Sequence, residues 1–235
     1  MKPPLLLAAS LLLMTMGLAE IPSHVATTPV PRDGEAWWVE RHTQCAALTA
    51  AGGVDLAFLG DSITQGWEGQ PAWEKHFAPL KAANFGFSGD RTEHVLWRLA
   101  NGELVGLTPK VVVIMIGTNN LGHNSSTPKQ TADGVKAIVA TLRDKIPNAK
   151  ILLLAIFPRD EKPDGPLRRQ AAEASAHFKD AADGTRVHYL DLSASFLLDD
   201  GTVPKEIMPD FLHLSEKGYA AWAAAIAPKI AELMK

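Results

Sequence analysis

Residues 111–116 form an unbroken apolar run, Val-Val-Val-Ile-Met-Ile, and this run constrains the fold more than any other feature of the sequence. A strand with one face in water alternates apolar and polar side chains, whereas a parallel strand covered on both faces does not. The run therefore predicts a buried parallel strand. Four further short apolar segments, at 54–59, 81–85, 150–156 and 186–190, are predicted as its neighbours.

Helical patterns separate the predicted strands. At residues 127–130, Thr-Pro-Lys-Gln combines an N-cap, a proline at the first helical position and a capping box, and the helix should run to about Lys145. Further helices are expected over 34–51, 167–182 and 215–234, the last of them kinked or broken at Pro228. Alternating strands and helices predict an α/β fold: a three-layer αβα sandwich around a flavodoxin-like, doubly wound parallel sheet of about five strands.

Composition limits the chain to one domain and excludes some functions. The 235 residues are 46% hydrophobic, which suits a single core, and nothing resembles an internal repeat or a linker between domains. The net charge is −3 without a basic patch, so nucleic acid is not an expected partner. No cysteine and histidine residues have metal-ligand spacing, and neither a metal nor another cofactor is expected.

The first 19 residues have the pattern of an export signal. Lys2 is followed by a mostly apolar stretch of about 14 residues from Leu5 to Leu18, and Ala19 offers a small residue for cleavage. This stretch is shorter than the roughly 20 residues that span a bilayer, so no transmembrane segment is expected in the mature chain. We therefore expect an exported protein, periplasmic or secreted, with a signal peptide (1–19), a lead-in segment (20–33) and a folded domain (34–235).

Three residues from two distant parts of the sequence supply the groups of a nucleophilic catalyst. Ser62 directly follows the strand predicted at 54–59 and begins a helix, while Asp210 and His213 lie three residues apart before the terminal helix. An alcohol, an imidazole and a carboxylate are what acyl transfer through a covalent intermediate requires. By itself Ser62 would be read as an ordinary helix start, with Asp61 or Ser62 as the N-cap.

Two loops between these residues favour the catalytic interpretation. Residues 84–90 follow the second predicted strand, and their glycines allow a ligand to approach the backbone closely. Residues 116–120 follow the third predicted strand and contain Asn119, whose amide could donate a hydrogen bond to an oxyanion. Among the eight histidines only His213 has a carboxylate at the spacing of a catalytic base, and His94 is interpreted as a packing residue.

With these motifs in place, residues 54–219 resemble the SGNH (GDSL-type) hydrolase family, whose four blocks match 60–62, 86–89, 117–120 and 210–213. The resemblance implies that Ser62 is the nucleophile, that His213 is the general base and that Asp210 orients His213. It also implies an oxyanion hole made by the Ser62 N–H, the Gly89 N–H and the Asn119 side chain.

Within the family, several segments resemble the catalytic subunits of intracellular platelet-activating-factor acetylhydrolase. They include Asn-Phe-Gly at 84–86, Pro-Arg at 158–159, Glu-Lys-Pro at 161–163 and Asp-Phe-Leu-His-Leu at 210–214. Two features differ from those subunits: the predicted export signal and the loop 122–126. The resemblance also implies a homodimer.

Residues beside the catalytic groups should set the length of the acyl chain. These neighbours, Ile63, Thr118, Phe211 and Leu212, are medium to bulky, which favours a shallow site and a short acyl group such as acetyl. The sequence therefore predicts an exported serine esterase for short-chain esters of a small molecule, an acetylated lipid or an acetylated glycan. A lysophospholipase, a polysaccharide esterase of the same fold and a non-catalytic binding protein that reuses the fold remain as alternatives.

Overall fold

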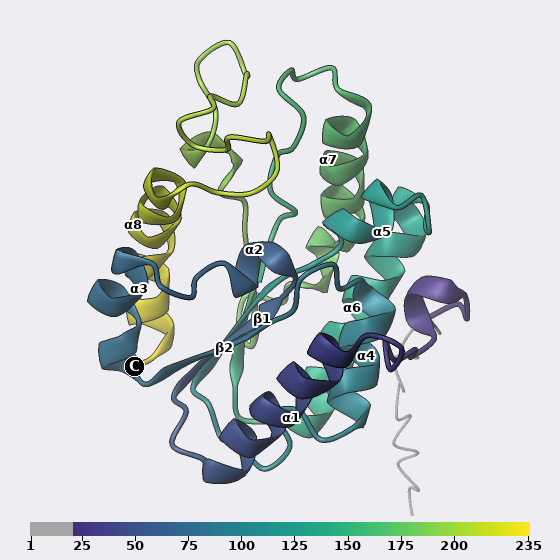
Figure 1. Cartoon of the computed structure of the whole chain (residues 1–235), viewed down its shortest axis with the longest axis vertical. Coiled ribbons are helices and arrows are strands. Elements are labelled where there is room, and N and C mark those ends of the chain that lie inside the picture. Colours follow the sequence, from purple (N-terminus) through teal and green to yellow (C-terminus); the bar gives the residue numbers. More distant parts are fainter. Residues whose placement is uncertain (1–20) are drawn as a thin grey trace, which may run out of the picture.

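A five-stranded parallel sheet organises the computed structural model, which describes residues 21–235 (Figure 1). The strand order is β2-β1-β3-β4-β5, and every pair of neighbours is parallel. The fold class predicted from the sequence is confirmed, and each of the five predicted strands is present. Their bounds are β1 Leu56–Gly60, β2 Ala82–Gly86, β3 Val111–Met115, β4 Lys150–Leu154 and β5 Val187–Leu190. The predicted signal peptide at 1–19 lies outside the described residues.

Eight α-helices in the described part of the chain connect and cover the strands. They are α1 Ala36–Ala51, α2 Ser62–Gln65, α3 Pro71–His76, α4 Thr92–Ala100, α5 Thr118–Gly122, α6 Pro128–Lys145, α7 Pro166–Phe178 and α8 Glu216–Leu233. The predicted capping box opens α6, with Thr127 as N-cap and Gln130 as its reciprocal partner.

Two helices differ from the sequence prediction. The segment predicted as one helix over 167–182 ends its α-helix at Phe178 and continues as a 3₁₀ turn over Lys179–Ala181. Helix α8 runs through Pro228 to Leu233 without a break. The proline removes one helical hydrogen bond, but Trp222, Ile226 and Ile230 are fully buried around it, and this packing holds the helix together.

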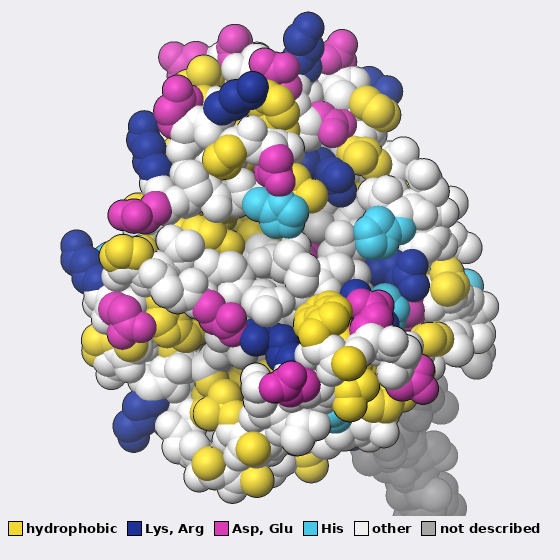
Figure 2. Space-filling model, viewed as in Figure 1, with side chains coloured by type: hydrophobic (Ala, Val, Ile, Leu, Met, Phe, Trp, Pro, Cys, Tyr) yellow, Lys and Arg dark blue, Asp and Glu magenta, His cyan; other side chains and the backbone are white. Residues whose placement is uncertain are grey.

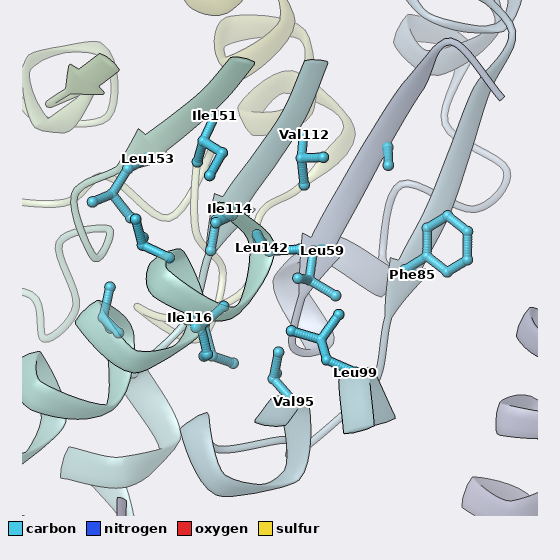
Figure 3. Packing of buried hydrophobic residues seen from close by; sticks show 14 of the residues in the cluster. Leu59, Phe85, Val95, Leu99, Val112, Ile114, Ile116, Leu142, Ile151 and Leu153 are labelled. Carbon is cyan, nitrogen blue, oxygen red and sulfur yellow. The ribbon is translucent and has the colours of Figure 1, made fainter. Parts of the chain in front are cut away.

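Helices cover both faces of the sheet and form a three-layer sandwich. Helices α1, α4, α6 and α7 pack on one face, where Leu59, Val112 and Ile114 point into a common core (Figure 3). Helices α3 and α8 pack on the other face, which receives Phe58 and Val113. Because successive side chains of a strand point to opposite faces, the apolar runs supply both cores at once.

The topology brings the loops after β1, β2 and β3 to one edge of the sheet. Strand β1 lies between β2 and β3, and Gly60 is in register with both Gly86 and Met115. The chain switches direction here, and such switch points are where open α/β sheets bind ligands. A Cβ on Gly60 would lie only 2.2 Å from Thr64 Oγ1 and 2.3 Å from the Met115 carbonyl, so the turn after β1 requires glycine.

A long segment, residues 191–215, joins β5 to α8 and is held by the loop after β4. The Asp160 N–H donates to the Phe211 carbonyl (3.1 Å), and the Val203 N–H donates to the Glu161 carbonyl (2.9 Å). The buried Arg168 joins both pieces, donating to the carbonyls of Asp160 (2.7 Å) and Gly201 (3.1 Å). The Pro-Arg and Glu-Lys-Pro motifs of the sequence thus lie in or beside the support of the segment that carries Asp210 and His213.

The lead-in segment packs against the domain. Ala26 is fully buried, and its carbonyl accepts a hydrogen bond from Thr92 Oγ1 (2.8 Å). The Val30 N–H donates to the Glu93 carbonyl (3.2 Å), which places the end of the segment beside α4. Across residues 21–235, no helix has the length and apolar character to cross a membrane.

Candidate active site

Ser62 begins α2 at the carboxyl edge of the sheet, as the sequence predicted. Asp61 is the N-cap, and its Oδ1 accepts the N–H of Ile63 (3.0 Å). Ser62 Oγ lies 3.0 Å from Nε2 of His213, 151 residues further along the chain. This is hydrogen-bond distance, so the imidazole can accept the hydroxyl proton.

His213 is in turn held by Asp210. Nδ1 of His213 lies 2.7 Å from Asp210 Oδ2, while Asp210 Oδ1 accepts the N–H groups of Leu212 (3.1 Å) and His213 (2.7 Å). Partial burial would raise the pKa of Asp210, but the hydrogen bonds from His213 outweigh it and lower that pKa below its ordinary value. An ionised Asp210 fixes the tautomer in which Nδ1 carries the proton and Nε2 is free to act as a base.

The turn that carries this pair has an unusual backbone. Phe211, between Asp210 and Leu212, has φ of 58°, in the left-handed region that a bulky side chain rarely adopts. Its carbonyl accepts the Asp160 N–H, so the support after β4 holds this conformation. The turn lets one carboxylate contact both the imidazole and two backbone N–H groups.

Two backbone N–H groups and one side chain are available to bind an oxyanion. In the described part of the chain, the N–H groups of Ser62 and Gly89 donate to no other group. Asn119 Nδ2 donates to the Asp90 carbonyl (3.0 Å), which leaves its second amide hydrogen free. Gly89 has φ of 73°, which favours glycine there.

A buried ionic cluster beneath these donors was not found by sequence reasoning. Asp90, which is fully buried, is the centre of this cluster. Its Oδ1 accepts hydrogen bonds from Trp38 Nε1 (2.8 Å) and Arg32 Nη1 (3.0 Å). Its Oδ2 accepts a hydrogen bond from Arg98 Nε (2.9 Å). Arg98, also fully buried, pairs with Glu103 as well. Because the Asp90 carbonyl accepts a hydrogen bond from the Asn119 amide, the cluster fixes the Gly89 loop and this amide together. An arginine in the apolar pattern of residues 95–99 was the one signal that could have revealed it.

Asp61, next to Ser62, is a second buried carboxyl group. It is fully buried, and its Oδ2 has no hydrogen-bond partner among the described residues. Burial raises the pKa of Asp61 to about 7, although the hydrogen bond from Ile63 acts in the opposite direction. The Asp61 carboxyl group therefore stays protonated to a higher pH than an ordinary carboxylic acid. The same side chain caps the helix that presents Ser62.

The four residues predicted to set acyl length occupy different environments. Ile63 is 1% exposed and Thr118 is 1% exposed, and both Thr118 oxygens accept from Arg159 Nη1 (3.0 Å each). Phe211 and Leu212 are partly buried and pack at the edge of the core on the α8 side.

His94, predicted as a packing residue, is 4% exposed. Within residues 21–235, no three His, Cys, Asp or Glu side chains are grouped as a metal site.

Residues 58–221 match the GDSL-like lipase/acylhydrolase family. The chain belongs to this family of esterases. Among curated relatives, it is 37% identical over 213 residues to human platelet-activating factor acetylhydrolase IB subunit alpha1, covering 89% of this chain and 90% of that protein. It is also 37% identical over 203 residues to the rat alpha2 subunit, covering 86% of this chain and 87% of that protein.

Solved structures confirm the family fold. A GDSL-like lipase from Bacteroides thetaiotaomicron superposes with a TM-score of 0.67 at 19% identity, covering 81% of this chain and 97% of that one. An acetylxylan esterase from Geobacillus stearothermophilus superposes with a TM-score of 0.61 at 20% identity, covering 76% and 94%. The GDSL chain described here therefore has the α/β sandwich of its family and the family's acylhydrolase activity.

Proposed function

We propose that this GDSL esterase is an exported enzyme that hydrolyses short-chain esters, acetyl esters above all, through an acyl-enzyme on Ser62. The observation that carries the proposal is the hydrogen-bonded series from Ser62 Oγ to His213 Nε2 (3.0 Å) and from His213 Nδ1 to Asp210 Oδ2 (2.7 Å). A protein that only reused the fold for binding would not need these three groups in line.

The proposed reaction has two stages at Ser62. His213 Nε2 takes the hydroxyl proton as Oγ attacks the ester carbonyl, and the protonated imidazole then gives that proton to the leaving alcohol. In the second stage, His213 takes a proton from water as the water attacks the acyl-enzyme, and the imidazolium returns this proton to Ser62 Oγ as the acid is released. Asp210 stabilises the imidazolium in both stages. The free N–H groups of Ser62 and Gly89 and the Asn119 amide donate hydrogen bonds to the carbonyl oxygen as it becomes negatively charged.

The preference for a short acyl group rests on the neighbours of the catalytic residues. Ile63 and Thr118 are held by their surroundings, since Tyr219 donates to the Ile63 carbonyl (2.8 Å) and Arg159 donates to Thr118. These residues cannot move aside easily, so added methylene groups would have to displace Phe211 or Leu212. Three of the named proteins are two acetylhydrolase subunits and an acetylxylan esterase, which supports acetyl transfer from either a lipid or a glycan.

The export proposal rests on the sequence of residues 1–19 alone. If it is correct, the protein isolated from its native cells lies outside the cytoplasm and begins at or near Glu20. N-terminal sequencing of that protein tests the proposal, and an intact Met1 on a cytoplasmic protein would refute it. The homodimer implied by the resemblance is tested by sedimentation of the purified chain.

The catalytic proposal is tested with 4-nitrophenyl esters of increasing acyl length and with an organophosphonate. The purified enzyme should hydrolyse 4-nitrophenyl acetate, and the phosphonate should label one serine, which peptide mapping should place at residue 62. Label on any other serine, with activity lost in proportion, would show that the nucleophile lies elsewhere.

A further inference from the structure

A small polar cavity lies beside the predicted oxyanion hole. Arg32, from the lead-in segment, covers Gly89: a Cβ on Gly89 would lie 3.3 Å from both Nη1 and Nη2 of Arg32. The Arg32 Nη1 also donates to the Ser88 carbonyl (2.6 Å), which holds the guanidinium against this loop. The cavity has a volume of about 180 Å³, and its lining consists of Arg32, Glu35, Gly89, Arg91, His94 and His123.

The lining is mostly polar and offers hydrogen bonds. Apart from the backbone of Gly89, each lining residue has a charged or hydrogen-bonding side chain. An acyl chain placed here would remove polar groups from water without giving them partners, which is unfavourable. The cavity therefore suits the alcohol part of the ester and not a fatty acyl chain.

The charges around the cavity compensate one another. Arg32 pairs with Glu35 (2.7 Å) and with Asp90 (3.0 Å), while Arg91 pairs with Glu93 (2.7 Å). Figure 2 shows the same mixture on one face of the molecule, where basic and acidic side chains and histidines lie next to one another. An anionic headgroup would find no cation here that lacks a partner.

The two histidines of the lining add hydrogen-bonding capacity without charge. The Arg91 N–H donates to Nδ1 of His94 (3.0 Å), so the neutral ring carries its proton on Nε2. Burial, and then the nearby Arg91, lowers the pKa of His94 to about 3, and the same causes lower the pKa of His123. Both rings are neutral in neutral solution. His94 is engaged by Arg91 at both ring nitrogens (3.0 Å at Nδ1 and 3.3 Å at Nε2), so it is His123 that can donate one hydrogen bond to a ligand and accept another.

An exposed aromatic side chain, Trp37, contacts two residues of the lining. The Trp37 indole is 40% exposed; its Nε1 donates to Glu35 Oε2 (3.0 Å), and the Arg32 guanidinium lies 5.1 Å from the ring centroid. Two lining residues thus fix the orientation of Trp37. A flat apolar ring beside neutral and paired polar groups matches a sugar ring, which has hydroxyl groups at its edge and C–H groups on its face.

We propose that the cavity beside Gly89 is a subsite for an uncharged sugar, so that the enzyme deacetylates carbohydrate esters in preference to phospholipid esters. The inference rests on the proposed function, because a substrate whose carbonyl oxygen binds the Gly89 N–H is what brings the leaving alcohol to this cavity. Arg32, Glu35 and His123 would hydrogen-bond the sugar hydroxyl groups, and Trp37 would contact the face of the ring.

The test compares three acetyl esters with the full-length enzyme: 4-nitrophenyl acetate, 6-O-acetylglucose, whose other hydroxyl groups are free, and an acetylated ether phospholipid presented as a dispersed monomer. We expect kcat/KM for the sugar ester to exceed that for the phospholipid by about tenfold or more. In Trp37→Ala and in His123→Ala, the ratio of kcat/KM for the sugar ester to that for 4-nitrophenyl acetate should fall about five- to tenfold. His177→Ala, an exposed histidine on α7, is the matched control and should leave this ratio unchanged.

Failure of the subsite and failure of the catalytic proposal give different results. A wild-type enzyme without activity on 4-nitrophenyl acetate would refute the proposed function itself. An active enzyme that prefers the phospholipid, or whose ratio is unaffected by both substitutions in variants with wild-type thermal melting, would overturn only the sugar subsite. Competitive inhibition by inorganic phosphate that is lost in Arg91→Gln would also overturn it, because it would show a site for anions.

Discussion

The two sides of the candidate site are held in different ways. On the oxyanion side, Asn119 is 8% exposed and rests on Asp90 and Arg98, which are fully buried. On the base side, the Asp210 and His213 side chains are 55% and 47% exposed and belong to a long irregular segment held chiefly by backbone hydrogen bonds. Figure 1 shows this segment above the sheet, next to α2, with α5 farther to the right.

The two sides therefore differ in what they contribute: the buried cluster contributes mainly to stability, and the exposed pair contributes mainly to catalysis. The oxyanion donors must already be in place when charge develops, and a buried network achieves this at the risk of unpaired buried charge. The base must exchange protons with Ser62, the leaving alcohol and water, which requires access to solvent. Substitutions in the buried cluster should therefore reduce stability, whereas substitutions of the exposed pair should reduce activity with little effect on stability.

The largest effect is expected at the group where the two sides meet. Ser62→Ala removes the nucleophile but no packing, so kcat/KM for 4-nitrophenyl acetate should fall by about 10³-fold or more while thermal melting is unchanged. Ser195→Ala, at an exposed serine away from the site, is the control. Full activity in Ser62→Ala would refute the assignment of both sides.

The next effect is on stability and concerns the buried side. Arg98→Leu leaves Asp90 and Glu103 buried without their shared cation, so the free energy of unfolding in urea should fall by about 3–5 kcal/mol. Arg169→Leu, at an exposed arginine on α7, should change it by less than about 0.5 kcal/mol.

On the exposed side we expect the opposite result: a large loss of activity with little loss of stability. Asp210→Asn should leave the free energy of unfolding within about 1 kcal/mol of the wild type, because the side chain is mostly in water. Its kcat should fall by more than about 10²-fold, because the amide no longer fixes the tautomer of His213. Equal losses of stability in Arg98→Leu and Asp210→Asn would remove the distinction between the two sides.

A smaller effect is expected for a single oxyanion donor. Asn119→Ala should lower kcat by about 10²–10³-fold with little change in KM, because the amide acts on charge that appears only in the transition state. Asn148→Ala, at an exposed position, is the control. A raised KM with unchanged kcat would mean that Asn119 binds the substrate in its ground state instead.

The smallest effect concerns acyl length. Acetyl esters should be preferred over octanoyl esters by at least about tenfold in kcat/KM, and Leu212→Ala should reduce that preference by opening the partly buried edge of the site. Kinetics on a series of 4-nitrophenyl esters measures both. A wild type that prefers octanoate would favour a lysophospholipase over the short-chain esterase.

Local sequence patterns predicted the sheet and the parts of the site that belong to short motifs. The five apolar runs became five parallel strands, and the capping box at Thr127 opened α6 as expected. Ser62 after β1 and the Asp210–His213 pair were found because each depends on a spacing of a few residues. A kink or break was predicted at Pro228; the helix is not broken there, because buried neighbours on α8 outweigh one lost hydrogen bond.

The sequence by itself determined the layers and the strand ends, and it predicted the reactive groups, because hydrophobic periodicity and turn chemistry act over short distances. Only the tertiary structure decided that Ser62 Oγ lies 3.0 Å from His213, that Arg98 supports the Gly89 loop through Asp90, and that Arg32 reaches Gly89 from the lead-in segment. These contacts join residues from 8 to 151 positions apart. They depend on how strands and helices pack in three dimensions, and no pattern within a short window of sequence specifies that packing.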